Sequence, residues 1–111
     1  MRMSVMASNT LTFSDSSYLP LQYSDALYLA TRGGAQLLGM EASLGALEQD
    51  MAADLLLVDM AAQLKTQPFG GESAEDLVSK FVFLSDDRNI QQVWVAGRLV
   101  KDTADQQMLL Q

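Results

Sequence analysis

The sequence predicts an α+β fold, in which helices near the N-terminus are followed by strands, one further helix and a closing β-hairpin. Three observations lead to this class. Apolar residues recur at helical spacing in the first third of the chain, a continuous apolar run occupies residues 55–58, and apolar and polar residues alternate near the C-terminus around a tight-turn pair. With 111 residues, the chain is long enough for one small domain.

Two helical patterns open the chain. Met3 and Met6 place apolar side chains at helical spacing within residues 1–9, so a helix is expected there. A polar, proline-containing connection follows. A second helix is then expected over residues 23–32, with Asp25 in its first turn, where the helix dipole favours a carboxylate.

Gly33 and Gly34 are expected to end the second helix. The pair could also suggest a phosphate-binding loop, but it lacks the spacing of the known phosphate-binding motifs and no strand precedes it. A helix break with close backbone packing is therefore the favoured interpretation. A short helical turn is expected next and ends at Gly39, which is suited to a left-handed cap.

Residues 43–60 are expected to form two strands joined by a turn at Gln49 and Asp50. The run from Leu55 to Val58 is apolar without interruption, as expected for a strand that is covered on both faces. Asp54 stands just before this run and is expected to bond backbone groups there. Because no base accompanies it in the sequence, Asp54 is a poor candidate for a nucleophile.

Ser73 is expected to cap a helix over about residues 73–84. Ser73 and Asp76 stand three apart, which is a variant of the capping box. The expected apolar stripe of this helix consists of Leu77, Phe81 and Leu84.

A hairpin is expected to follow this helix. Val93 and Val95 alternate with Gln92 and Trp94, and Ala96–Gly97 stands where a tight turn would lie. Residues 102–111 carry weak signals and are expected to fray.

Composition excludes several classes of function. The net charge is −7 and the pI is near 4.2, so neither nucleic acid nor an anionic membrane is expected as a partner. No apolar run reaches the roughly 18 residues of a membrane span, and the N-terminal stretch lacks the long apolar region of a signal peptide. A cytoplasmic location is therefore the expectation, with which the lack of cysteine is compatible.

The chain contains no histidine and no cysteine, which bears directly on metal chemistry. A catalytic zinc site built by this chain alone is close to excluded, because such sites use about three ligands drawn mainly from those residues. Carboxylates would suit magnesium or calcium, but no Asp-rich loop spacing occurs. We therefore expect no catalytic, no cofactor-binding and no metal-binding residue in this chain.

Asp86, Asp87, Arg88 and Asn89 form the most conspicuous polar cluster, between two apolar runs. The two carboxylates resemble a pair for acid–base catalysis, but such a pair needs an enclosing cleft that separates the two pKa values. Polar residues at a junction commonly bond local backbone groups, so a structural role between helix and strand is favoured. A second polar stretch, residues 14–17, is interpreted as a solvated connection rather than a modification site or metal loop.

Three stretches of the sequence resemble a known family. Residues 27–48, LYLATRGGAQLLGMEASLGALE, and residues 53–59, ADLLLVD, resemble the end of the barrel and a recurrent strand in deaminases of the amidohydrolase superfamily. Residues 72–100, ESAEDLVSKFVFLSDDRNIQQVWVAGRLV, are similar to the C-terminus of the guanine deaminases, where a helix leads through a DDRNI segment into a hairpin. The resemblance covers nearly the whole chain except about its last ten residues.

This resemblance implies a C-terminal fragment of a metal-dependent hydrolase. Residues 1–40 would be closing helices of a (β/α)8 barrel, and residues 41–111 would be part of the accessory composite β domain, a β-sandwich, with one helix at about 73–84. In that family, zinc supports the hydrolysis of guanine to xanthine and ammonia, and its ligands precede the region matched here. None of the family's catalytic residues can be transferred to this chain, and the segment Asp86–Asn89 matches a late, structural part.

The sequence also departs from the family pattern. Where relatives place Pro-Gly-Lys at a strand turn, this chain has Gln49, Asp50 and Met51, so a looser turn is expected. The family's early strands are absent. We therefore expect a guanine deaminase-like fragment that is inactive by itself and that self-associates or binds the missing barrel portion. The alternatives are a non-catalytic interaction module, which pairs with itself or with a deaminase chain, and, more distantly, an independent carboxylate-based enzyme.

Overall fold

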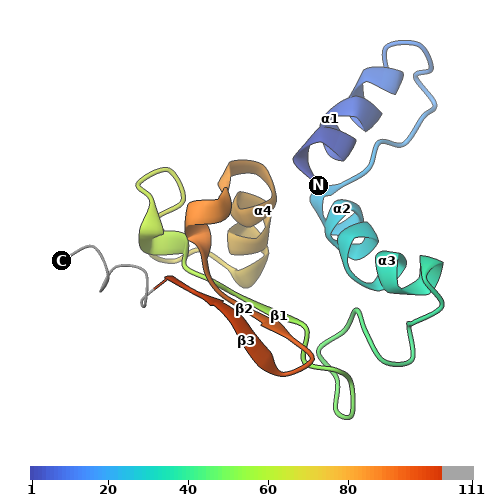
Figure 1. The fold of residues 1–111 in the computed structure, drawn as a ribbon. Helices are drawn as coiled ribbons and strands as arrows, with labels where there is room; N and C mark the ends of the chain where they lie inside the picture. Colours follow the sequence, from blue (N-terminus) through green and yellow to red (C-terminus); the bar gives the residue numbers. More distant parts are fainter. Residues whose placement is uncertain (104–111) are drawn as a thin grey trace.

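Helices occupy the first third of the chain and a small antiparallel sheet lies towards its end, in a computed structural model that describes residues 1–103 (Figure 1). The expected α+β class is confirmed. The elements are α1 (Arg2–Leu11), α2 (Tyr23–Ala30), α3 (Arg32–Leu37), β1 (Leu55–Val58), η1 (Met60–Ala62), α4 (Ala74–Leu84), η2 (Asp87–Asn89), β2 (Ile90–Val95) and β3 (Arg98–Asp102), where η denotes a 3-10 helix. Of residues 102–111, which were predicted to fray, all but 102 and 103 lie outside the described residues.

The break between α2 and α3 lies at Thr31, not at the glycine pair, so that prediction was wrong. Thr31 leaves helical geometry with φ −119° and ψ −94°, and α3 begins at the next residue with Gly33 and Gly34 inside it. A Cβ on Gly33 would lie 3.3 Å from the carbonyl oxygen of Tyr28. The glycines therefore allow the first turn of α3 to approach the last turn of α2 closely. The cap at Gly39 is confirmed, with φ +68°.

The capped helix predicted after Ser73 is confirmed as α4. The Ser73 hydroxyl accepts a hydrogen bond from the backbone N–H of Asp76 at 3.1 Å, and the Asp76 carboxylate accepts one from the N–H of Ser73 at 2.9 Å. The expected apolar stripe is only partly correct, because Val82 is the buried residue of the helix whereas Leu84 is exposed. α4 packs against α2, and the Arg2 side chain of α1 donates to the carbonyl of Ser85 at 2.9 Å.

The sheet has the strand order β1-β2-β3, and both pairs are antiparallel. In the β1–β2 pair Leu55 lies opposite Trp94. The predicted hairpin is confirmed, and its turn residues Ala96 and Gly97 have φ +49° and +75°. Positive φ at both positions is the geometry of the tight turn whose twist matches the flanking strands, and it strains alanine but not glycine.

The strand predicted ahead of Gln49 does not form, although Asp50 does adopt the left-handed conformation of a turn, with φ +68°. Residues 43–46 form a turn and bends instead, and residues 47–48 are irregular. Gly45 has φ +90°, and a Cβ there would lie 2.8 Å from the Cβ of Ala35, so the loop passes directly against α3. Contact with a helix has thus replaced pairing with a strand.

The chain forms a very small core. Within the described residues the buried hydrophobic side chains are Val5, Ala26, Ala35 and Val82. The accessible surface is 8092 Å2, whereas a folded monomer of 12.1 kDa exposes about 6000 Å2. The Cα radius of gyration is 16.6 Å, against about 13 Å for a compact domain of this length. The helices and the sheet therefore leave much apolar surface uncovered.

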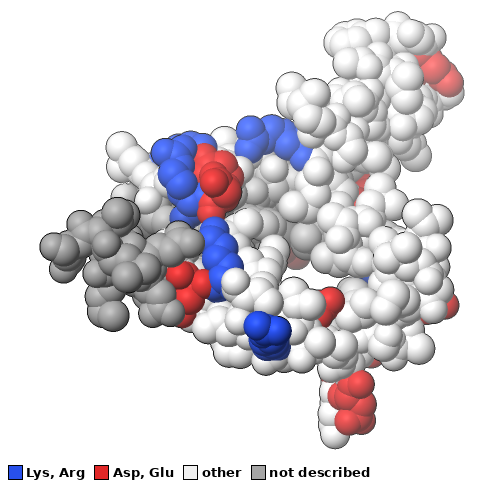
Figure 2. All heavy atoms as spheres, in the orientation of Figure 1, with Lys and Arg blue, Asp and Glu red and all other residues white. Residues whose placement is uncertain are grey.

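The predicted strand Leu55–Val58 is confirmed as β1, but this chain does not cover its faces. Leu55, Leu56 and Leu57 are 37%, 54% and 54% exposed. On the face shown in Figure 2, charged atoms gather mainly over the region around α4, while the surface over α1 to α3 is almost uncharged. Within residues 1–103 no helix is long and apolar enough to cross a membrane.

Candidate functional site

The polar residues singled out in the sequence lie at the junction between α4 and the sheet. We call the group formed by Asp59, Gln63, Lys65, Thr66, Asp86, Arg88 and Asn89 the junction cluster. It joins three segments: the end of β1 with η1, the loop that follows, and η2 between α4 and β2.

Asn89 is the centre of the junction cluster and is fully buried. Its side-chain amide donates to the carbonyl oxygen of Asp59 at 2.8 Å and to the hydroxyl of Thr66 at 2.9 Å. Its side-chain oxygen accepts from the Gln63 amide at 2.6 Å and from the N–H of Asp86 at 3.2 Å. All four hydrogen-bonding positions of the side chain are therefore used within the protein, which leaves none for a ligand.

Asp86 is held by cations and amides. Its carboxylate accepts from the Arg88 guanidinium at 2.8 and 3.1 Å, from the Lys65 ammonium at 2.9 Å and from the Gln63 amide at 2.8 Å. The hydrogen bonds from Arg88, followed by that from Lys65, hold the pKa of the Asp86 carboxyl far below its ordinary value. A general base needs a pKa near the working pH and a free lone pair, so Asp86 is unsuited to proton transfer.

Asp86 and Asp87 do not form a catalytic pair. The Asp86 carboxylate contacts Lys65 and Arg88. Asp87 is exposed, and its backbone carbonyl accepts a hydrogen bond from the Lys101 ammonium at 3.4 Å. An acid–base pair requires two carboxyls that face one substrate position in an enclosed site. The structural interpretation of residues 86–89 therefore agrees with their geometry.

The other candidate positions are also tied to local structure. The Asp54 carboxylate accepts from the backbone N–H of Ala96 at 2.7 Å, so it fastens the hairpin turn to the start of β1. This confirms that Asp54 bonds backbone groups. In the polar stretch at residues 14–17, the Asp15 carboxylate accepts from the N–H and the hydroxyl of Ser17, which lowers its pKa.

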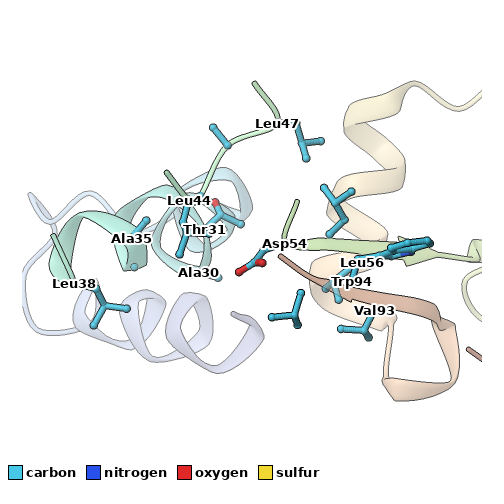
Figure 3. A pocket seen from close by; sticks show the side chains of 15 residues that line it. Ala30, Thr31, Ala35, Leu38, Leu44, Leu47, Asp54, Leu56, Val93 and Trp94 are labelled. Atoms are coloured by element: carbon cyan, nitrogen blue, oxygen red, sulfur yellow. The ribbon is translucent and has the colours of Figure 1, made fainter. Parts of the chain in front are cut away.

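An apolar cavity of about 540 Å3 lies between the helices and the sheet (Figure 3). Ala35 and Leu38 line it from the helical side, and Leu56 and Trp94 line it from the sheet. Asp54 is the one titratable residue among its lining groups. The cavity could hold apolar side chains, but it offers no nucleophile–base pair.

Sequence reasoning missed four members of the junction cluster: Asp59, Gln63, Lys65 and Thr66. They lie 21 to 30 residues before the Asp86 and Asn89 side chains that they contact, so no local spacing connects them to the segment 86–89. Across residues 1–103 no three His, Cys, Asp or Glu side chains gather as a metal site would require. The described residues thus do not fit a catalytic zinc ion.

Comparison with known proteins places this architecture in a family. The amidohydrolase family matches residues 1–100. The guanine deaminase of Mus musculus is 36% identical over 104 residues, which cover 89% of this chain and 23% of that protein. The structure of E. coli guanine deaminase matches with a TM-score of 0.73 and 31% identity, over 86% of this chain and 22% of the other.

A third match is the zinc-bound adenosine deaminase of Xanthomonas campestris, with a TM-score of 0.67 and 25% identity, over 96% of this chain and 25% of the other. The chain spans about a fifth of the length of the curated relatives it matches. The family match over most of the chain and the guanine deaminase relatives agree with each other. The chain belongs to the amidohydrolase family and is guanine deaminase-like.

Proposed function

We propose that this chain is the C-terminal part of a guanine deaminase-like enzyme and serves as framework rather than as catalyst. Residues 1–40 would close the (β/α)8 barrel, and residues 41–111 would supply part of the accessory β domain. The proposal rests on one combined observation: the family match extends over residues 1–100, while the sequence contains no histidine and no cysteine.

The reaction of the whole enzyme would be the zinc-dependent hydrolysis of guanine to xanthine and ammonia. Matching proteins include guanine deaminases and a deaminase with bound zinc. Because the residues of this chain do not fit a catalytic zinc site, the metal and the proton-transferring groups would come from the preceding part of the enzyme. The chain alone is therefore proposed to be inactive.

The contribution of this chain would be to hold apolar surfaces in position. The junction cluster ties the start of β2 to the end of β1 through the bonds of Asn89 and Asp59. The Asp54–Ala96 bond fixes the other end of β1 to the hairpin turn. These ties orient the exposed leucines of β1 and the cavity wall, which are surfaces that a barrel and further strands could cover.

A chimera tests this proposal. The matched segment of the mouse enzyme would be replaced by residues 1–100 of this chain, and zinc content and guanine turnover would be measured. We expect a zinc-loaded, active enzyme, because the exchanged segment carries no reacting group. A folded chimera that holds stoichiometric zinc but does not convert guanine would contradict the framework role.

The exposed apolar surface also supports the second candidate, a non-catalytic module that associates with itself or with a deaminase chain. The native gene product distinguishes the two. A mature polypeptide that also contains the histidine-bearing barrel, or an adjacent reading frame that encodes it, favours the framework role. A free-standing 12.1 kDa product encoded far from any deaminase gene favours the module.

A further inference from the structure

We draw no further inference here: the strongest candidate, the uncovered apolar surface formed by β1 and the cavity between the helices and the sheet, belongs to a chain that spans about a fifth of the length of its relatives, and nothing in the structure of residues 1–103 shows what covers it.

Discussion

Replacing Asn89 by alanine should destabilise the fold strongly, since four hydrogen bonds to a fully buried side chain would be lost. The partners are the carbonyl of Asp59, the hydroxyl of Thr66, the amide of Gln63 and the N–H of Asp86. The Gln63 amide keeps a second hydrogen bond, to the Asp86 carboxylate at 2.8 Å. At about 0.5–1.5 kcal/mol for each bond, we expect a loss of about 3 kcal/mol.

Such a loss is a large fraction of the roughly 5–15 kcal/mol that stabilises a small domain. Urea unfolding followed by circular dichroism, at one fixed protein concentration, measures it, because association would otherwise change the apparent stability. Asn9→Ala is the matched control, since Asn9 is exposed on α1, and its free energy of unfolding should change by less than about 0.5 kcal/mol. An Asn89→Ala variant as stable as this control would refute the role of the junction cluster.

Three further predictions follow from the caps, the turn and the ion pairs. Ser73→Ala should cost about 1 kcal/mol of stability in urea unfolding, because it removes the N-cap bond to Asp76. Ala96→Asn should stabilise by about 0.5–1 kcal/mol in the same assay, because Ala96 has φ +49° and Asn-Gly suits this turn better. Asp86→Asn should flatten the acid side of the stability curve: hydrogen bonds from Arg88 hold the pKa of the Asp86 carboxyl below its ordinary 3.8, so its contribution is complete above that pH and is lost as the pH falls below it. An acid titration in which both proteins lose stability in parallel would contradict this assignment.

Local signals in the sequence predicted the elements that depend on neighbouring residues. The Ser73–Asp76 capping box and the Ala96–Gly97 turn each act over a few residues, and both were correctly identified. Their energies arise within one turn of chain, so no knowledge of the rest of the fold is needed.

The wrong predictions concern segments whose conformation depends on tertiary contacts. Gly33 and Gly34 have low helix propensity, yet they lie within α3, and a Cβ on Gly33 would make a tight contact of 3.3 Å with the Tyr28 carbonyl oxygen of α2. The strand expected before Gln49 is replaced by a loop in which Gly45 contacts α3. Apolar residues in that segment gave no information about which surface they would meet.

The candidate site was predictable in role but not in composition. The segment Asp86–Asn89 was interpreted as a junction, because turn residues of these types bond local backbone. Its partners Gln63 and Thr66 come from a loop more than 20 residues earlier, and only the folded chain brings them to Asn89. Burial of Asn89, which makes the cluster important for stability, is likewise a property of the assembled structure.

We propose that this guanine deaminase-like chain is framework and does not itself catalyse deamination. The most direct measurement combines zinc analysis of the purified chain with an assay for xanthine and ammonia released from guanine, with an intact guanine deaminase as the positive control. We expect zinc far below one ion per chain and no turnover above background, because the sequence offers no histidine or cysteine ligand. Stoichiometric zinc, or guanine turnover that persists through rigorous purification, would contradict it.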